Sequence, residues 1–212
     1  YLRVLALLDD NDPRRPAVLL ELAAAHERTG DVEPARQRYR EAADLSRSGD
    51  DASTLAHAAL GMQSLGHRSG AQNAEVLDLL REAAARLEDS GGALILRSRV
   101  LAATTRAVRH SAYAEPDAEL LQPAQRAVEL AAAAGNPAAL AAAKLAVHDA
   151  MWAPGTAAAR LPVLDEMLKA AQAAADADLT AQAHLLRATA LLELGDPAGR
   201  DELLTYITLA GA

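Results

Sequence analysis

The sequence predicts an all-α fold, a right-handed α-solenoid of about five degenerate helix-turn-helix repeats. Hydrophobic residues make up 51% of the chain but aromatic residues only 2%, and there is no phenylalanine. Alanine is the commonest residue, so the core must be built by close helix–helix approach rather than by bulky side chains. Apolar positions in the first helix of each unit also recur roughly every 35 to 44 residues, a spacing typical of paired-helix repeats. These positions are Leu20, Leu55, Leu96, Leu140 and Leu179. A compact helical bundle would satisfy the same apolar pattern, and the spacing favours the solenoid.

The most regular unit lies at residues 16–47, with its two helices expected at about 16–29 and 32–47. Gly30 can adopt the left-handed conformation that ends a helix, and Asp31 is expected to cap the next helix through its side chain. Tyr39 is the large side chain expected to fill the gap against the following unit. The unit resembles the tetratricopeptide repeat, with His26 where that family usually places an aromatic residue. The positions that carry the resemblance are Leu19, Leu22, Ala23, Gly30, Ala35, Tyr39 and Ala42.

One unit cannot bury its apolar face alone, so further units are expected to follow it. The second is expected to be irregular, with helices from Ala52 and from about 74 to 88 joined by a long loop at 66–73. The third carries a long loop at 110–116, Asn136 caps the fourth, and the fifth ends in a shortened helix. The predicted units are about 16–48, 51–90, 92–134, 136–175 and 177–210, within a single repeat domain at 10–212.

Residues 1–9 are expected to form the end of a preceding helix, because their leucines recur at three-residue spacing. The chain does not begin with methionine, which leads us to expect a fragment of a longer protein.

Composition and charge exclude several classes of function. The formal net charge of −8 disfavours direct binding to a nucleic-acid backbone, because that affinity comes largely from neutralised phosphates. With no cysteine the chain can form neither a disulfide nor a thiol nucleophile, which fits a reducing cytoplasm. No uninterrupted apolar stretch of about 20 residues exists, so we expect no membrane span.

We expect no catalytic residue, no metal site and no cofactor. Neither a GxxxxGK(S/T) phosphate loop nor a GxGxxG motif is present. Ser64 lies between two glycines, but it has no preceding strand and the segment 61–66 is expected to be a helix end. The six histidines are scattered without metal-ligand spacing. Acidic residues gather at repeat boundaries, where carboxylates cap helix N-termini and stay in water. They are Asp9, Asp10, Asp50, Asp51, Asp176 and Asp178.

One segment offers a candidate site for a ligand or partner, the run from His148 to Gly155 that holds the only tryptophan. In a solenoid the first helices line the concave surface, where Trp152 could meet His148, Arg187 and His184. A filler between repeats is, however, the favoured interpretation of Trp152, ahead of ligand contact. The arginines at 97, 99, 106 and 109 are expected to form a solvated face. An α-helical enzyme using the His148 region is a further alternative, but it lacks a nucleophile or metal partner.

The order of several segments resembles the tetratricopeptide-repeat region of large actinobacterial ATP-binding LuxR-type transcriptional regulators, in which an AAA/STAND ATPase precedes the repeats. The segments are 55–61, 79–83, 135–143, 148–155, 160–161 and 191–196. The resemblance implies a sensor and scaffold arm that a protein, a peptide or a small inducer engages. A structural adaptor or self-association module is the alternative, and ATPase-linked cyclases or kinases share the same layout.

Overall fold

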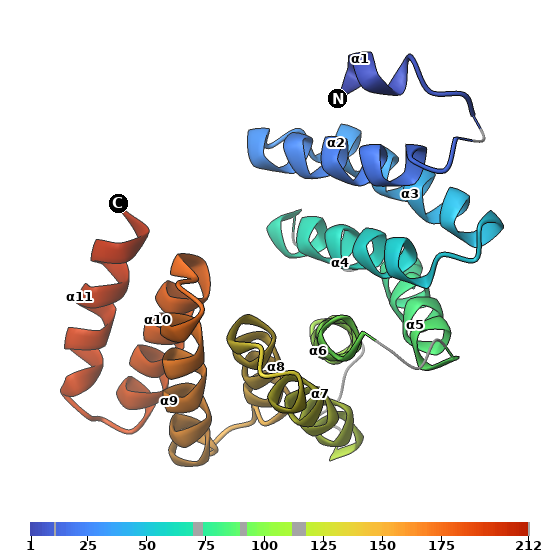
Figure 1. Ribbon diagram of the computed structural model, residues 1–212. Helices are drawn as coiled ribbons and strands as arrows, with labels where there is room; N and C mark the ends of the chain where they lie inside the picture. The colour runs from blue at the N-terminus through green and yellow to red at the C-terminus, as the bar shows by residue number, and fades with distance from the viewer. Residues whose placement is uncertain (11, 70–73, 90–92, 112–117, 212) are drawn as a thin grey trace. The chain divides into compact units, whose positions relative to one another are not determined.

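The computed structural model describes residues 1–10, 12–69, 74–89, 93–111 and 118–211. The described residues form eleven α-helices and one 3-10 turn, and they contain no strand (Figure 1). The predicted all-α class is therefore confirmed. Contacts divide the chain into two compact units, Tyr1–Leu96 and Arg97–Ala212. Each unit is described by itself, and the single repeat domain at 10–212, the number of repeats and their handedness stay predictions.

In the first unit, each helix packs against the next one along the chain, and α2 also contacts α4. Packing between alternate helices is what stacked helix pairs produce, because the first helix of one pair lies on the first helix of the next. Residues 1–9, predicted to be helical, form only a single helical turn. The helices are α1 (Leu2–Leu5), α2 (Arg15–Thr29), α3 (Val32–Ser48), α4 (Ala52–Ser69) and α5 (Ala74–Asp89).

The turn between α2 and α3 has the predicted backbone but not the predicted cap. Gly30 has a φ of 82°, in the left-handed region, and its N–H bonds back to the Glu27 carbonyl. The Asp31 side chain, however, accepts no hydrogen bond from the start of α3. It accepts the Thr29 hydroxyl at 2.8 Å and lies 3.4 Å from His26 Nδ1. The capping prediction for Asp31 is wrong because these two side chains of the preceding helix occupy its carboxylate.

Capping predictions at three other unit boundaries are confirmed, at one residue each. The side chains of Asp51, Asn136 and Asp176 accept backbone N–H groups three residues later, at 3.0, 2.8 and 2.9 Å. Each bond satisfies one of the N–H groups that a helix start leaves unpaired.

Tyr39 joins α3 to α4, as expected of the large residue of the unit. Its ring is buried and lies so close to Gly61 that a Cβ atom there would be 2.2 Å from Tyr39 Cζ. The Tyr39 hydroxyl donates to Glu27 at 3.0 Å, and Ser64 donates to the same carboxylate at 2.6 Å. Burial and the Glu27 carboxylate raise the pKa of Tyr39. Ser64 thus belongs to a polar contact between helices.

The segment from Gly61 to Gly66 was expected to end a helix and to begin a long loop, and both expectations are wrong. It lies inside α4, which continues to Ser69. Met62 and Leu65 are buried there, and this packing offsets the roughly 1 kcal/mol cost of a glycine within a helix. Residues 70–73 of the predicted loop, and 112–116 of the loop predicted in the third unit, lie outside the described residues.

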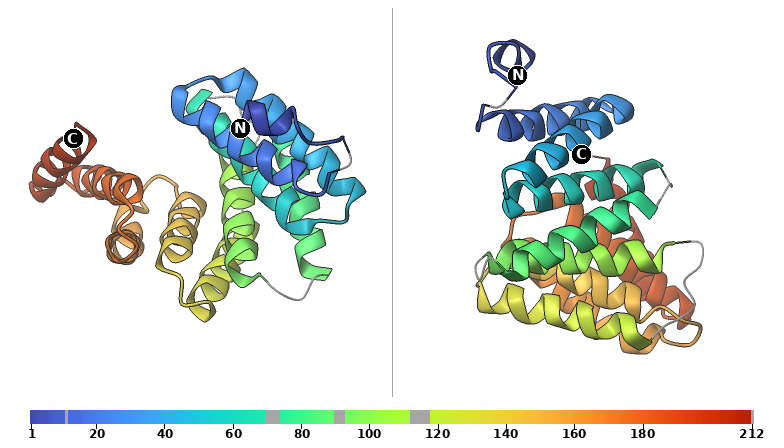
Figure 2. Two further views of the ribbon diagram at one scale, coloured as in Figure 1. Left: turned by 45° about the horizontal axis from the view of Figure 1, so that its top comes forward. Right: turned by 90° about the vertical axis from the view of Figure 1, so that its right-hand side faces the viewer.

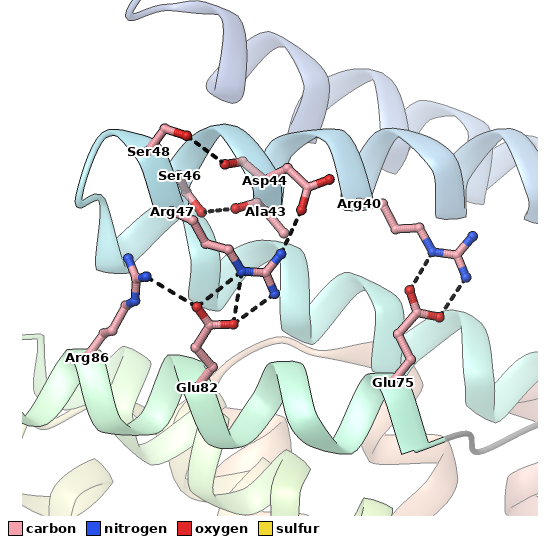
Figure 3. Close-up of polar contacts among 9 residues, drawn as sticks. All are labelled: Arg40, Ala43, Asp44, Ser46, Arg47, Ser48, Glu75, Glu82 and Arg86. Carbon is pink, nitrogen blue, oxygen red and sulfur yellow. Dashed lines mark hydrogen bonds and ion pairs between the residues drawn. The ribbon is translucent and has the colours of Figure 1, made fainter.

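Two ion pairs link α3 to α5 (Figure 3). Arg40 binds Glu75 at 2.5 and 2.6 Å, and Arg47 binds Glu82 at 2.8 Å. The partners of each pair are 35 residues apart, so they occupy equivalent positions of successive helix pairs. The hydrogen bonds from Arg40 and Arg47 lower the pKa of Glu75 and Glu82. We call this set the α3–α5 ion-pair ladder.

In the second unit, α7 to α11 likewise pack in chain order, and Figure 2 shows α11, in red at the C terminus, beside α10 in orange. One core cluster combines α6, α7 and α8 and consists of five alanines and Val147. Small residues thus allow close approach, as the composition predicts. The elements are α6 (Leu94–Arg109, within this unit from Arg97 onward), η1 (Ala118–Leu120), α7 (Leu121–Ala133), α8 (Pro137–Ala150), α9 (Ala157–Ala173), α10 (Ala177–Glu193) and α11 (Ala198–Ala210).

Candidate ligand-binding site

A pocket of about 380 Å³ lies in the second unit, between the C-terminal ends of α6 and α8 and the middle of α10. All three helices are the predicted first helices of their units, the set that lines the concave face of a solenoid. The volume is near the lower end of the range for small-molecule sites. We call it the first-helix pocket. Its lining residues are Arg106, Arg109, His110, His148, Asp149, Trp152, Gln182 and Leu186.

Asp149 is the centre of the polar contacts around this pocket. Its buried carboxylate accepts Arg106 Nε at 2.8 Å and lies 3.0 Å from His110 Nε2 and 3.1 Å from His148 Nδ1. Burial alone would raise the pKa of Asp149. The hydrogen bonds from the two histidines and the charge of Arg106 outweigh burial and hold that pKa well below its usual range. Asp149 is therefore a fixed negative charge that orients the groups of the pocket.

Arg109 holds the chain at the end of α8. Its Nε donates to the carbonyl of Asp149 at 3.1 Å, and its Nη2 donates to the carbonyl of Trp152 at 2.8 Å. A helix leaves its last carbonyls without partners inside the helix, and an arginine near that end is a favourable donor to them. The contact fixes the backbone from which Trp152 projects.

Trp152 is packed on one side and open on another. The guanidinium of Arg160 lies 4.0 Å from the ring centre, and the His148 ring meets it edge-on with centroids 5.4 Å apart. Arg160 is fully buried and donates to Glu193 at 2.6 Å. A desolvated cation–π contact of this kind contributes about 2 kcal/mol. Even so, Trp152 remains 36% exposed and lines the pocket. Trp152 therefore fills space between helices, as one prediction held, and its ring is also accessible from the pocket. Contact between Trp152 and a ligand stays a prediction.

The structure brings together only part of the predicted site. His148 and Trp152 are in contact, whereas Arg187 and His184 bind Glu202 of α11 at 3.0 and 2.6 Å. Arg187 also pairs with Asp165 of α9. Neighbouring residues of a helix point about 100° apart, so α10 turns Leu186 toward the pocket and Arg187 away from it. The predicted meeting of Arg187 with His148 and Trp152 is wrong.

Arg106 and Arg109 were expected to form a solvated face, and instead they hold the end of α8. Their positions, together with His110, follow the i, i+3, i+4 spacing of one helix face, a signal in the sequence that could have grouped them. Arg160 has no comparable signal, because its carboxylate partner lies 33 residues away on another helix.

Two other hollows are weaker candidates. One of about 310 Å³ follows the α3–α5 ion-pair ladder, where the main charges already bind each other. The other, about 590 Å³, lies beside the start of α8, and four of its eleven described lining residues are alanines. Lys144, at its edge, is paired with Glu166.

Within the described ranges, no three His, Asp or Glu side chains gather closely enough to hold a metal ion. The same residues contain no helix that is long and apolar enough to cross a bilayer. No protein-family model matches the chain, and the search of curated proteins gives no match either.

Proposed function

We propose that this chain is a non-enzymatic helical-repeat segment of a larger regulatory protein, one that controls transcription, and that it binds a small inducer in the first-helix pocket. The observation that carries the proposal is the accessible Trp152 in a pocket built by α6, α8 and α10. An aromatic side chain beside a few fixed polar groups is typical of small-molecule sites. The resemblance to the repeat arm of ATP-binding LuxR-type regulators supports the regulatory role.

Binding accounts for the pocket better than catalysis does. Among the described residues that line it, there is no serine, threonine, cysteine or lysine to act as a nucleophile. The carboxylate of Asp149, with its lowered pKa, is a weak base at neutral pH. His148 is completely buried and bound between Asp149 and Arg160. The polar groups thus hold one another in place, which suits recognition.

A thermal-shift screen of metabolites tests the proposal, because a ligand that binds only the folded state raises the melting temperature. At a ligand concentration of 100 Kd the folded state gains about 2.7 kcal/mol. Tryptophan fluorescence then locates the binding, since Trp152 is the only tryptophan. The substitution Gln182→Phe fills the pocket and should abolish the response. The control Gln172→Phe, at an exposed position of α9, should leave it unchanged.

Two results would contradict the proposal. One is a broad screen in which no compound stabilises the chain. The other is a set of ligands that bind Gln182→Phe as well as the unchanged protein, which would place their site elsewhere.

Self-association is a second candidate function, favoured by exposed apolar side chains on α10 and α11 and just beyond α10. Leucines and an isoleucine that are 41% to 56% exposed gather there. An exposed apolar patch of this kind marks an interaction surface. Sedimentation over a dilution series tests it: a dimer that Ile207→Asp dissociates would support this function, and a monomer at every concentration would rule it out. The residues are Leu192, Leu194, Leu204, Ile207 and Leu209.

A further inference from the structure

We infer that the first-helix pocket selects a small aromatic monocarboxylate, with the carboxylate bound by Arg106 and the ring lying on Trp152. The inference rests on the proposed function and deepens it by naming the chemical class of the ligand. Three properties of the pocket carry it: its net charge, the donors that Arg106 retains, and the size and surface of its apolar part.

The net charge of the pocket suits a ligand that carries one negative charge. Arg106 and Arg109 supply two positive charges and Asp149 one negative charge, with the histidines counted as neutral. Arg160 and Glu193 pair with each other behind the tryptophan and cancel. Counted over the described residues of the pocket, one positive charge remains. A monoanion balances it, whereas a dianion such as a phosphate monoester would leave an unbalanced negative charge in a partly buried site.

Arg106 keeps the donors that a carboxylate requires. Its Nε is bound to Asp149 at 2.8 Å, which fixes the plane of the guanidinium. Among the residues that the structure describes, its Nη1 and Nη2 atoms have no hydrogen-bond partner. These two nitrogens form the end-on fork that binds both oxygens of a carboxylate. Because the side chain is already held by Asp149, little conformational entropy is lost when a ligand binds.

The apolar part of the pocket suits a single flat ring. Trp152 offers an accessible aromatic surface and Leu186 an aliphatic wall. Aromatic rings prefer offset-stacked or edge-to-face contact, which a planar ligand can make with the indole. Gln182 adds an amide that can bind a ring substituent. A volume of about 380 Å³ accommodates a substituted benzene ring.

The experiment compares probes that differ in one property at a time, by calorimetry and by the fluorescence of Trp152. Benzoate and phenylacetate carry both the ring and the carboxylate. Benzamide lacks the charge, cyclohexanecarboxylate lacks the aromatic ring, and phenyl phosphate carries the larger charge. We expect each of these three to bind at least tenfold more weakly than the better aromatic carboxylate.

Substitutions then test the role of Arg106. Arg106→Gln should weaken aromatic carboxylates at least tenfold and leave the weak binding of benzamide unchanged. Arg106→Lys keeps the charge but loses the fork, so it should restore only part of the affinity. The control is Arg126→Gln, which removes an exposed arginine of α7 that pairs with Glu129. The comparison of probes on the unchanged protein remains decisive if an Arg106 variant does not fold.

The outcomes separate the ligand class from the proposed function. Equal binding of benzoate and benzamide, or tighter binding of phenyl phosphate, would overturn the inference and leave the proposed function standing. The inference would also be overturned, and the proposed function kept, if a ligand of another class quenched the fluorescence of Trp152 and neither aromatic carboxylate bound. If no compound of any class binds, the inference and the proposed function both fail.

Discussion

Gly61 lies beneath the ring of Tyr39, and the substitution Gly61→Ala tests how α3 packs on α4. The added Cβ atom would lie 2.2, 2.3 and 2.6 Å from Cζ, Cε1 and Cε2 of the ring. Since carbon atoms pack best at about 3.5–4.0 Å, the ring or the helix must move by more than about 1 Å. The ring has little room, because Tyr39 is 5% exposed and its hydroxyl is bound to Glu27.

Two opposing terms determine the size of the effect. Overpacking of a buried site costs about 1–3 kcal/mol, and the severe overlap places this site at the upper end. Alanine is a better helix former than glycine by about 1 kcal/mol, which offsets part of that cost. We therefore expect Gly61→Ala to lower the free energy of unfolding by about 2 kcal/mol.

A double-mutant cycle, measured by urea denaturation followed by circular dichroism, isolates the clash. Tyr39→Leu removes all three overlapping atoms while keeping an apolar side chain, so in that background Gly61→Ala should stabilise by about 1 kcal/mol. Gly49→Ala is the control, because its Cβ would meet only the Leu45 carbonyl at 3.6 Å. The reasoning is refuted if Gly61→Ala is neutral or stabilising beside Tyr39, or has the same effect in both backgrounds.

Three further predictions concern the polar contacts. Asp149→Asn should destabilise the chain by about 3 kcal/mol at neutral pH, because it leaves the charges around a buried carboxylate without their partner. Since the folded-state pKa of Asp149 is lowered, its contribution is complete above the unfolded pKa of about 3.9 and is lost as the pH falls below it. Unfolding curves of the two proteins should thus converge in acid, and a constant gap would argue against this cause. In the α3–α5 ion-pair ladder, a double-mutant cycle of Arg47→Gln and Glu82→Gln should give a coupling of about 0.5 kcal/mol that weakens in salt; zero coupling at low salt would contradict the pairing. Asn136→Ala should lower the free energy of unfolding, measured by thermal denaturation, by about 1 kcal/mol. Asp31→Ala should lower it less, because Asp31 caps no helix. The opposite order would show the capping assignments to be mistaken.

Much of the fold could be predicted because its signals are local. The first unit was expected at 16–29 and 32–47, and α2 and α3 occupy 15–29 and 32–48. Gly30 ends α2 with a backbone in the left-handed region, a conformation that turns the chain away from the helix axis. The caps at Asn136 and Asp176 depend only on a side chain and a backbone N–H three residues away. Interactions of such short range are encoded within a few residues.

The errors arose where another side chain competes for the same group or the same space. Asp31 sits at a capping position, but Thr29 and His26 take its carboxylate. A glycine such as Gly61 is typical of a helix end. Gly61 nevertheless lies inside α4, because the ring of Tyr39, on another helix, fills the space that a side chain at position 61 would need. The Asp31 outcome depends on which of several nearby donors its carboxylate meets. The Gly61 outcome does not follow from the nearby sequence, because it depends on which groups meet after the helices have packed.

By itself, the sequence determined that the chain is helical, where the two helices of the first unit begin and end, and that small residues build the core. It also placed His148 and Trp152 on one helix end, four residues apart. Only the tertiary structure decided which other groups join them: Arg160 behind the indole, Arg106 and Arg109 from α6, and Leu186 of α10 in place of Arg187. The physical reason is that helical periodicity sets which residues share a face of one helix, whereas the rotation of that helix against its neighbours is set by the packing of the whole core.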